Sequence, residues 1–303
     1  MAIVPMTKIR FYVHRSNRGK MLDLLQDKGV TQVYELGNIE NTKKENVSGE
    51  LSLLDRQLGA VKSALGVLTE FDDEKKPLFS TRKPIDKAAY TSMKKEADSV
   101  LKIAAKINLL SKGVAEKRAN IARLRALIAG YEPWINFDLP LNFSGTRQTA
   151  ALIGTVTTEL SFDAFCSEVE QAFENVYISR IAPDSEQMGI FLVCLREQRF
   201  EVEDFIRKLG FSKPSYMPAH TAKQEIANLE KEIMQLEAEI SQSHTDLRLL
   251  VESKNELQLA YDFLMITKDK YEVRSMLQFT KSSFVLEGYT PTRDAQRLKA
   301  DFE

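Results

Sequence analysis

The sequence predicts an α+β fold, a dumbbell of two small ferredoxin-like α/β lobes joined by a long antiparallel helical coiled-coil hairpin. Three observations predict it. Short segments that read as strands occur near both ends and in the middle of the chain. Long segments between them carry apolar residues at alternating steps of three and four, the spacing of a helix that packs on another helix. Only 13 glycines and 9 prolines occur among 303 residues, which disfavours a loop-rich, all-β fold.

The first lobe begins with residues 1–45. Residues 7–13 alternate polar and apolar side chains, which is typical of a half-buried strand. Ser16 is predicted to cap the helix that follows, and Gly29 to end it, because glycine accepts the positive φ of a helix C-terminus. Residues 31–36 read as a second strand. Because two strands and one helix bury little core alone, this opening needs a partner from later in the chain.

Residues 46–135 are predicted to form the outgoing part of the helical rod. A first helix covers residues 48–71, and a polar break with two prolines follows it. A second helix covers residues 86–132 and ends near Gly130 and Pro133, since both residues disfavour helix continuation.

Residues 218–278 are predicted to form the returning part of the rod. A helix over 221–277 keeps the same apolar spacing, with Ser243 and Lys254 at the two skipped positions. A helix that long needs a partner helix. Residues 86–132 carry ten basic and five acidic residues, whereas 221–281 carry eleven acidic and eight basic. The two helices are therefore expected to pair antiparallel, with the helix over 48–71 alongside.

Residues 136–217 are predicted to form the second lobe. Strand-like and helix-like segments alternate there in the order β-α-β-β-α-β, the ferredoxin-like split arrangement. Ser161 is predicted to cap the first helix of this lobe. The expected strands are 150–157, 176–181, 189–195 and 211–217, and the expected helices follow Ser161 and cover 200–209.

Residues 279–303 are predicted to return to the first lobe. Residues 283–289 read as its third strand, and Thr290-Pro291 opens a last helix. A second ferredoxin-like lobe needs one strand more, so this lobe is expected to be incomplete at its C-terminal end.

Composition excludes several classes of protein. The 42 basic and 43 acidic residues give a net charge of −1, without the basic excess that nucleic-acid binding usually requires. Two cysteines cannot form a disulfide framework, which favours a reducing compartment. The longest run without a charged residue covers 148–158 and is too short to span a bilayer. These features predict a soluble, cytoplasmic chain without nucleic-acid partners.

The search for reactive motifs finds no catalytic constellation. The chain lacks GxxxxGK[ST], GxGxxG, HExxH and CxxC, so phosphate-binding loops and common metal signatures are not expected. His14, His220 and His244 lie in three separate elements. His14, beside an arginine, could contact a phosphate, but a surface residue is the better interpretation, and His244 is interpreted as a surface residue of the rod.

The remaining candidates also favour structural roles. Cys166 and Cys194 are interpreted as buried small hydrophobes rather than a redox pair. The acidic run 72–74 could bind a metal, but two lysines follow it directly, so a solvated linker is the better interpretation. Trp134 is expected to anchor the junction between rod and second lobe. The predicted sets of catalytic, cofactor-binding and metal-binding residues are therefore empty, and an enzyme is not expected.

Five segments of the chain carry a family resemblance: residues 1–36, YEPWINFDLPL (131–141), IGTV (153–156), FIRKLGF (205–211) and SFVLEGYTPTRD (283–294). Together they resemble subunit I (subunit a) of rotary V-type and archaeal-type ATPases. The family typically has Gly-Trp-Val-Pro where this chain has Gly288-Tyr289-Thr290-Pro291. The order and spacing of these segments cover essentially the whole chain.

The resemblance implies a cytosolic N-terminal half of a stator subunit without its own catalysis, cofactor or metal. It implies docking of peripheral stalks, which are E/G-type heterodimers, on the two lobes, contact with the central-stalk cap of the rotor, and attachment to a membrane domain that carries the ion pathway. Such a subunit resists rotor torque during proton or sodium transport. The alternative is a cytosolic coiled-coil adaptor unrelated to ATPases. The residues that dock the stalks are not identified by the sequence.

Overall fold

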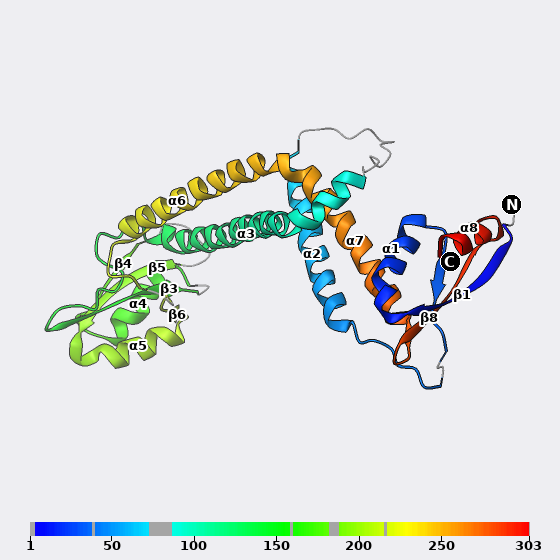
Figure 1. The fold of residues 1–303 in the computed structure, drawn as a ribbon. Coiled ribbons are helices and arrows are strands. Elements are labelled where there is room, and N and C mark those ends of the chain that lie inside the picture. Colours follow the sequence, from blue (N-terminus) through cyan, green and yellow to red (C-terminus); the bar gives the residue numbers. More distant parts are fainter. Residues whose placement is uncertain are drawn as a thin grey trace. The chain divides into compact units, whose positions relative to one another are not determined.

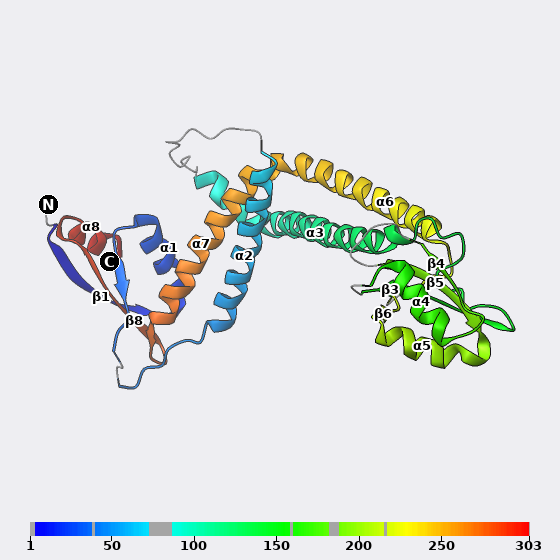
Figure 2. The same ribbon diagram turned by 180° about the vertical axis from the view of Figure 1, so that it is seen from behind.

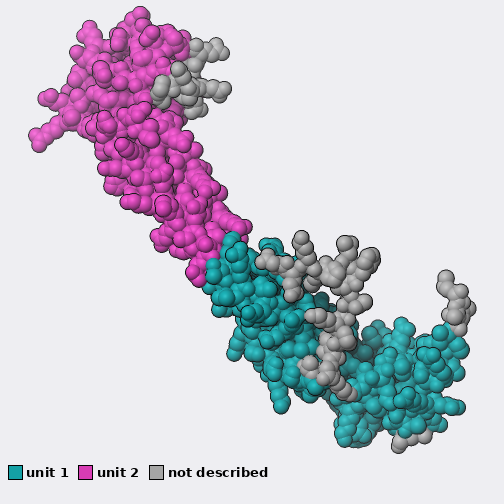
Figure 3. Space-filling model, turned by 90° about the horizontal axis from the view of Figure 1, so that it is seen from above, with its two compact units in different colours: residues 1–112, 244–303 teal, residues 113–243 magenta. Residues whose placement is uncertain are grey.

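The computed structural model describes residues 4–37, 40–72, 87–157, 160–181, 188–214 and 217–302. The described residues form a mixed α/β structure with two sheets, and the chain divides into two compact units. Unit 1 holds residues 1–112 and 244–303, and unit 2 holds residues 113–243 (Figure 3). The predicted mixed fold class is confirmed. The dumbbell arrangement and the division into 1–45 with 279–303, 46–135 with 218–278, and 136–217 stay predictions.

The sheet of unit 1 joins the first and last strands of the chain. Its order is β1-β8-β2, and a short strand β7 also pairs with β8; all of these pairings are antiparallel. The strands are β1 (Met6–His14), β2 (Gln32–Tyr34), β7 (Gln278–Phe279) and β8 (Ser283–Pro291) (Figure 1). The strands predicted at 7–13 and 283–289 are confirmed, and the one predicted at 31–36 is shorter. Strand β7 was not predicted, because two residues are too few to show an alternation.

Two helices cover one face of this sheet. Helices α1 (Arg18–Lys28) and α8 (Thr292–Phe302) bury Leu22 and Leu298 against Phe284 of β8. Gly29 ends α1 with a φ of 62°, as predicted. The predicted cap at Ser16 is wrong. A short 3₁₀ turn (Arg15–Asn17) precedes α1 and makes Asn17 the residue before the helix, so Ser16 is not in capping position.

The rest of unit 1 is helical. It contains α2 (Ser48–Glu70), the first part of α3 (Lys87–Tyr131), the 3₁₀ turn η4 (Leu250–Ser253) and α7 (Lys254–Met276). Helix α2 lies beside α7 in both ribbon views (Figures 1 and 2). The fully buried Val61, Ile107 and Leu257 belong to one core cluster, which joins α2, α3 and α7. The side-chain amide of Asn108 donates to the carbonyl of Ala60 at 2.8 Å, which ties α3 to α2.

Unit 2 pairs the second part of α3 with α6 (Ala222–Leu249). Ile121 and Leu124 of α3 pack with Leu229 and Ile233 of α6 in one cluster. Trp134, just after α3, is buried in the cluster that also contains Ala222, the first residue of α6. The C-terminal end of α3 therefore lies at the N-terminal end of α6, and the two helices run antiparallel, as predicted.

The sheet of unit 2 confirms the predicted β-α-β-β-α-β order. Its strands lie in the order β4-β5-β3-β6 with antiparallel pairings. Helices α4 and α5 cover one face, and Phe191 and Ile153 on the other face pack toward Trp134. Ser161 caps α4 by accepting from the N–H of Ala164 at 3.3 Å, as predicted. The elements are β3 (Thr149–Val156), α4 (Phe162–Ala172), β4 (Tyr177–Arg180), β5 (Met188–Leu195), α5 (Arg199–Lys208) and β6 (Phe211–Ser212).

Two predicted elements differ from the observed ones. The return helix over 221–277 is not continuous, because η4 separates α6 from α7. A 3₁₀ turn has three residues per turn, so it changes which side chains face the neighbouring helices. Directly after this turn, the buried Lys254 pairs with Asp72.

The strand predicted at 211–217 is only two residues long, and residues 215–216 lie outside the described part. Residues 73–86 also lie outside it; they hold all but the first residue of the polar break predicted over 72–84, including Asp73 and Glu74, and the first residue of the predicted second helix.

The core of unit 1 gives a direct stability test within one helix. Ile107 is 0% exposed, whereas Leu109 on the opposite side of α3 is 70% exposed. We expect Ile107→Ala to lower the free energy of unfolding by about 2–5 kcal/mol, since it removes buried methyl groups and leaves a cavity. Leu109→Ala should change it by less than about 0.5 kcal/mol. Chemical denaturation of both variants measures this, and equal losses would contradict the assigned face of α3.

Candidate functional site

The outer face of the sheet in unit 1 is a candidate docking surface. Because side chains alternate along a strand, even-numbered residues of β1 point away from α1 and α8. Lys8, Arg10 and Tyr12 are about half exposed or more, at 51%, 49% and 69%. We define the outer face as these three residues together with Tyr34 of β2 and Glu287 and Tyr289 of β8.

A buried carboxylate lies at the centre of this outer face. Glu287 is only 2% exposed, and its carboxylate accepts hydrogen bonds from Tyr34 and Arg10. The Nζ of Lys8 lies 2.9 Å from its Oε2. The hydrogen bonds from Tyr34 and Lys8 lower the pKa of Glu287 to about 2. Glu287 is therefore ionised at neutral pH and holds two half-exposed cations at fixed positions.

Aromatic rings extend the outer face around this ion cluster. Tyr34 and Tyr289 stack with ring centroids 5.3 Å apart and an interplanar angle of 28°. The ammonium of Lys8 lies 5.5 Å from the centroid of the Tyr34 ring. Tyrosine and arginine are enriched at the centres of protein interfaces. This arrangement suits recognition of another protein chain and has no nucleophile activated by a base.

A second ion cluster occurs on α5 of unit 2. Glu203 is buried, and it lies 2.6 Å from Arg207 and 2.7 Å from Lys213. Burial raises the pKa of Glu203, but the hydrogen bond from Lys213 and the neighbouring cations outweigh it and lower the pKa. Phe200, which is exposed, lies beside Arg199 with the guanidinium carbon 6.0 Å from the ring centroid. This cluster, with Phe200, forms the candidate docking surface of unit 2.

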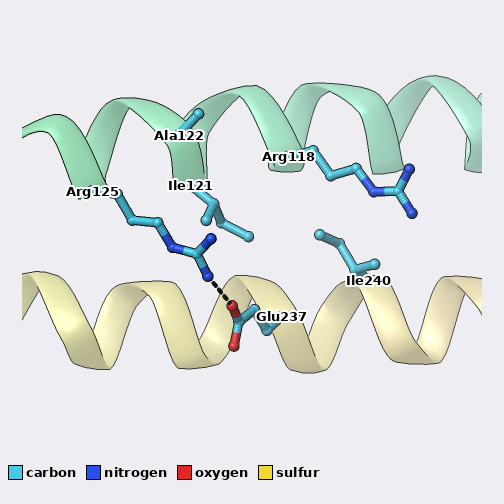
Figure 4. Close-up of a pocket in the computed structure, with 6 residues that line it drawn as sticks. All are labelled: Arg118, Ile121, Ala122, Arg125, Glu237 and Ile240. Carbon is cyan, nitrogen blue, oxygen red and sulfur yellow. Dashed lines mark hydrogen bonds and ion pairs between the residues drawn. The ribbon is translucent and has the colours of Figure 1, made fainter.

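A groove also lies between α3 and α6 of unit 2 (Figure 4). Its volume is about 350 Å³. Arg125 donates to Glu237 across it at 2.8 Å. Both partners are more than half exposed, so this pair contributes little stability. The lining residues are Arg118, Ile121, Ala122, Arg125, Glu237 and Ile240.

The three histidines of the chain lie in different surroundings. His14 is exposed, with Nδ1 2.8 Å from the hydroxyl of Ser16. His220 is exposed, and its carbonyl accepts from the N–H of Leu141. His244 is partly buried, and its ring centroid lies 5.4 Å from that of Phe71. Within the described ranges, no group of three or more His, Cys, Asp and Glu side chains could hold a metal ion.

The cysteines, Trp134 and Asp72 have packing or pairing roles. Cys166 and Cys194 are free thiols, and burial raises the pKa of both, which disfavours the reactive thiolate. Cys194 belongs to the core of unit 2. Trp134 is buried where the end of α3 meets the sheet, which fits its predicted anchoring role. Asp72 pairs with Lys254.

Sequence reasoning missed the Glu287 cluster. One signal was present, because a lone carboxylate in the apolar segment SFVLEGY is unusual for a buried strand and requires a partner. The sequence could not name that partner. None of the described helices combines the length and the apolar composition that crossing a membrane requires.

Comparison with known proteins supports the resemblance predicted from the sequence. No protein-family profile matches the chain. The sequence is 24% identical over 236 residues to A-type ATP synthase subunit I of Methanocaldococcus jannaschii, covering 73% of this chain and 34% of that protein. The chain therefore spans about a third of the length of the curated relative it matches.

A solved structure shares the fold. The crystal structure of the cytoplasmic N-terminal domain of subunit I, homolog of subunit a, of V-ATPase aligns with a TM-score of 0.55 and 15% identity. The alignment covers 97% of this chain and 96% of that one. At this identity the likeness establishes the fold alone. Together, the relative and the fold confirm the predicted resemblance to subunit I.

The Glu287 cluster predicts a pH dependence of stability. The pKa of Glu287 is lowered on folding from its ordinary value of 4.5 to about 2. Its contribution is therefore complete above about pH 4.5 and is lost as the pH falls toward 2. We expect Glu287→Gln to be less stable than the wild type at pH 7 and to lose part of the acid-induced decrease. Urea unfolding between pH 7 and pH 2.5 measures this.

The exposed Glu252 provides the matched control on the same unit. Glu252→Gln should keep the wild-type decrease between pH 4.5 and 2.5. An unchanged pH profile in Glu287→Gln would show that the cluster does not stabilise the fold.

Proposed function

We propose that this chain is a stator component of a rotary V-type or A-type ATPase. In this role it links peripheral stalks to the membrane ion-translocating part and resists rotor torque during ATP-coupled proton or sodium transport. The observation that carries the proposal is the sequence similarity to A-type ATP synthase subunit I. The shared fold over nearly the whole chain supports it.

The proposed role is mechanical, not catalytic. ATP chemistry belongs to other subunits in this proposal, and the chain needs neither cofactor nor metal for it. Long paired helices suit force transmission, since α3 packs along α6 in unit 2 and joins α2 and α7 in one core in unit 1. The chain would lie on the cytoplasmic side of the membrane, attached through a membrane domain of the same subunit.

The proposed partners are E/G-type stalk heterodimers on the two sheet-containing lobes, with the central-stalk cap as a further contact. The outer face around Glu287 and the α5 surface around Glu203 are the proposed positions of these contacts. Two separate docking points on one chain raise the effective concentration of the second contact once the first is made. Double docking therefore supports firm attachment with two modest interfaces.

Binding to purified stalk heterodimers tests the proposal. We expect the chain to bind an E/G heterodimer of the same organism in size-exclusion chromatography with light scattering. Charge reversal at both candidate surfaces, Arg10→Glu with Arg207→Glu, should weaken that binding at least tenfold, a loss of about 1.4 kcal/mol. Absence of any complex at tens of micromolar would contradict the stator role and favour an unrelated coiled-coil adaptor.

The mechanical role makes a separate prediction for α6. Leu236 packs partly buried against α3 within unit 2. Leu236→Pro removes a helix hydrogen bond and clashes with the preceding turn, which costs about 3 kcal/mol or more and kinks the helix. We expect stalk binding by the isolated chain to survive, while ATP-driven ion pumping by the assembled complex falls.

Leu236→Ala is the matched control, because it removes side-chain contacts and keeps the helix straight. It should leave pumping near the wild-type level. Spin labels on α6 on either side of residue 236 can report the kink. Normal pumping together with a measured kink would show that stiffness of this helix is not required.

A further inference from the structure

The return helix is interrupted at a place where its local sequence gives no reason for an interruption. The 3₁₀ turn η4 covers Leu250–Ser253, between α6 and α7. Sharp breaks in helices usually occur at proline, at glycine–serine pairs or where a side chain enters the hydrogen-bond ladder. Residues 247–257 contain neither proline nor glycine. The side chain of Ser253, just before α7, makes no capping hydrogen bond. The cause of the break therefore lies in contacts with other elements.

The end of α2 makes such contacts on both sides of η4. Before the turn, the ring of His244 on α6 lies with its centroid 5.4 Å from that of Phe71, the residue that follows α2. After the turn, the ammonium of Lys254, the first residue of α7, pairs with the carboxylate of Asp72. All four residues belong to unit 1. Two adjacent residues of the chain thus contact two residues that lie ten positions apart in the return helix.

The geometry of a 3₁₀ turn explains how both contacts form together. An α-helix turns by about 100° per residue and a 3₁₀ helix by about 120°. The ten steps from His244 to Lys254 include the four residues of η4 and therefore turn by about 1080°, three full turns. In a continuous α-helix the same ten steps turn by about 1000°, which leaves the two side chains about 80° apart. Only the interrupted helix presents both residues on one side, toward the end of α2.

The ion pair also needs the turn, because both of its side chains are only 11% exposed. A buried charge that loses its partner is strongly destabilising. In a continuous α-helix Lys254 would point within about 20° of Leu247, which belongs to an apolar core cluster. The 3₁₀ turn moves Lys254 to about 60° from that direction, where Asp72 lies. The turn and the ion pair therefore depend on each other.

The apolar pattern of this region also fits a continuous helix. A run with steps of three and four crosses the break, and Lys254 is its one charged position. Its apolar members are Leu247, Leu250, Leu257, Tyr261 and Leu264. The interrupted helix uses a slightly different set, since Ala260 is 1% exposed and Tyr261 is only partly buried. The same sequence thus supports two packings that differ in the backbone of four residues.

We propose that residues 250–253 form a two-state joint in the return helix, held in the 3₁₀ state by the ion pair between Lys254 and Asp72. When the pair opens, the segment becomes α-helical, and the side chains on its two sides turn by about 80° relative to one another. The helix shortens by about 2 Å, because a 3₁₀ helix rises about 2.0 Å per residue and an α-helix about 1.5 Å. Packed cores favour two discrete arrangements over continuous deformation. The inference concerns this chain alone and does not rest on the proposed stator function.

The test measures the backbone of residues 248–255 in the full chain by NMR. Contacts between an α-proton and the amide two residues later mark a 3₁₀ turn, and contacts with the amide four residues later mark an α-helix. We expect the first pattern over residues 250–253 of the wild type. Lys254→Met, which removes the charge and keeps an unbranched side chain, should give the second pattern. It should also slow amide exchange there about tenfold, since hydrogen bonds of a 3₁₀ turn have poorer geometry.

Three further variants control for charge, for ion pairing in general and for folding. Lys254→Arg keeps the charge and should keep the 3₁₀ pattern. Lys268→Met removes another ion pair between α7 and α2, since Lys268 lies 2.8 Å from Asp55, and should also keep it. Asp72→Leu combined with Lys254→Met leaves neither charge of the pair buried alone, so it guards against a folding defect in the single variant. It should show the α-helical pattern.

Three outcomes would overturn the inference. The first is a 3₁₀ pattern that persists in folded Lys254→Met or, if that variant does not fold, in the double variant. The second is loss of the 3₁₀ pattern in Lys254→Arg or Lys268→Met, because the turn would then not depend on this particular pair. The third is an α-helical pattern over residues 250–253 in the wild type.

Discussion

The pairing of β1 with β8 is the constraint on which the rest of the structure depends. Nine residues of the first strand pair in continuous antiparallel register with the last strand. The chain between them runs through unit 2 and must return to unit 1, and the antiparallel packing of α3 with α6 brings it back. Loop closure over so many residues costs conformational entropy. The long ladder and the α1 and α8 helices packed on it offset that cost.

Buried charges in both units are each compensated by several partners. The carboxylate of Glu287 contacts Tyr34, Lys8 and Arg10. That of Glu203 contacts Lys213 and Arg207. An unpaired buried charge would be strongly destabilising, so these partners hold the carboxylates ionised and in place. In both units, the fixed carboxylate therefore holds the neighbouring cations in ordered positions at the surface. In the docking role proposed above, these ordered cations favour contact with a partner surface of complementary charge.

The two sheets share the order of three strands, since β1, β8 and β2 of unit 1 correspond to β3, β5 and β4 of unit 2, but they differ in what covers their second face. In unit 2 that face packs on aromatic side chains at the end of α3, through Phe191 and Ile153. In unit 1 the corresponding face presents half-exposed cations and tyrosines. The sheet of unit 2 therefore anchors the paired helices, whereas that of unit 1 leaves a charged and aromatic surface exposed, where we propose that a partner docks. This difference fits a stator subunit in which attachment and stiffness are separate tasks.

The sequence by itself determined the features that depend on local periodicity. The three-four spacing identified α2, α3 and α6, alternation identified β1, and Ser161 and Gly29 acted as local signals of helix ends. Other features were not visible as local patterns. Strand β7 is too short to show a period, and a 3₁₀ turn rather than Ser16 precedes α1. The break at η4 lies next to the pairing of Lys254 with Asp72, a residue far away in the chain. The candidate site was decided by tertiary structure, because Arg10 and Glu287 are 277 residues apart and meet only through the β1–β8 register.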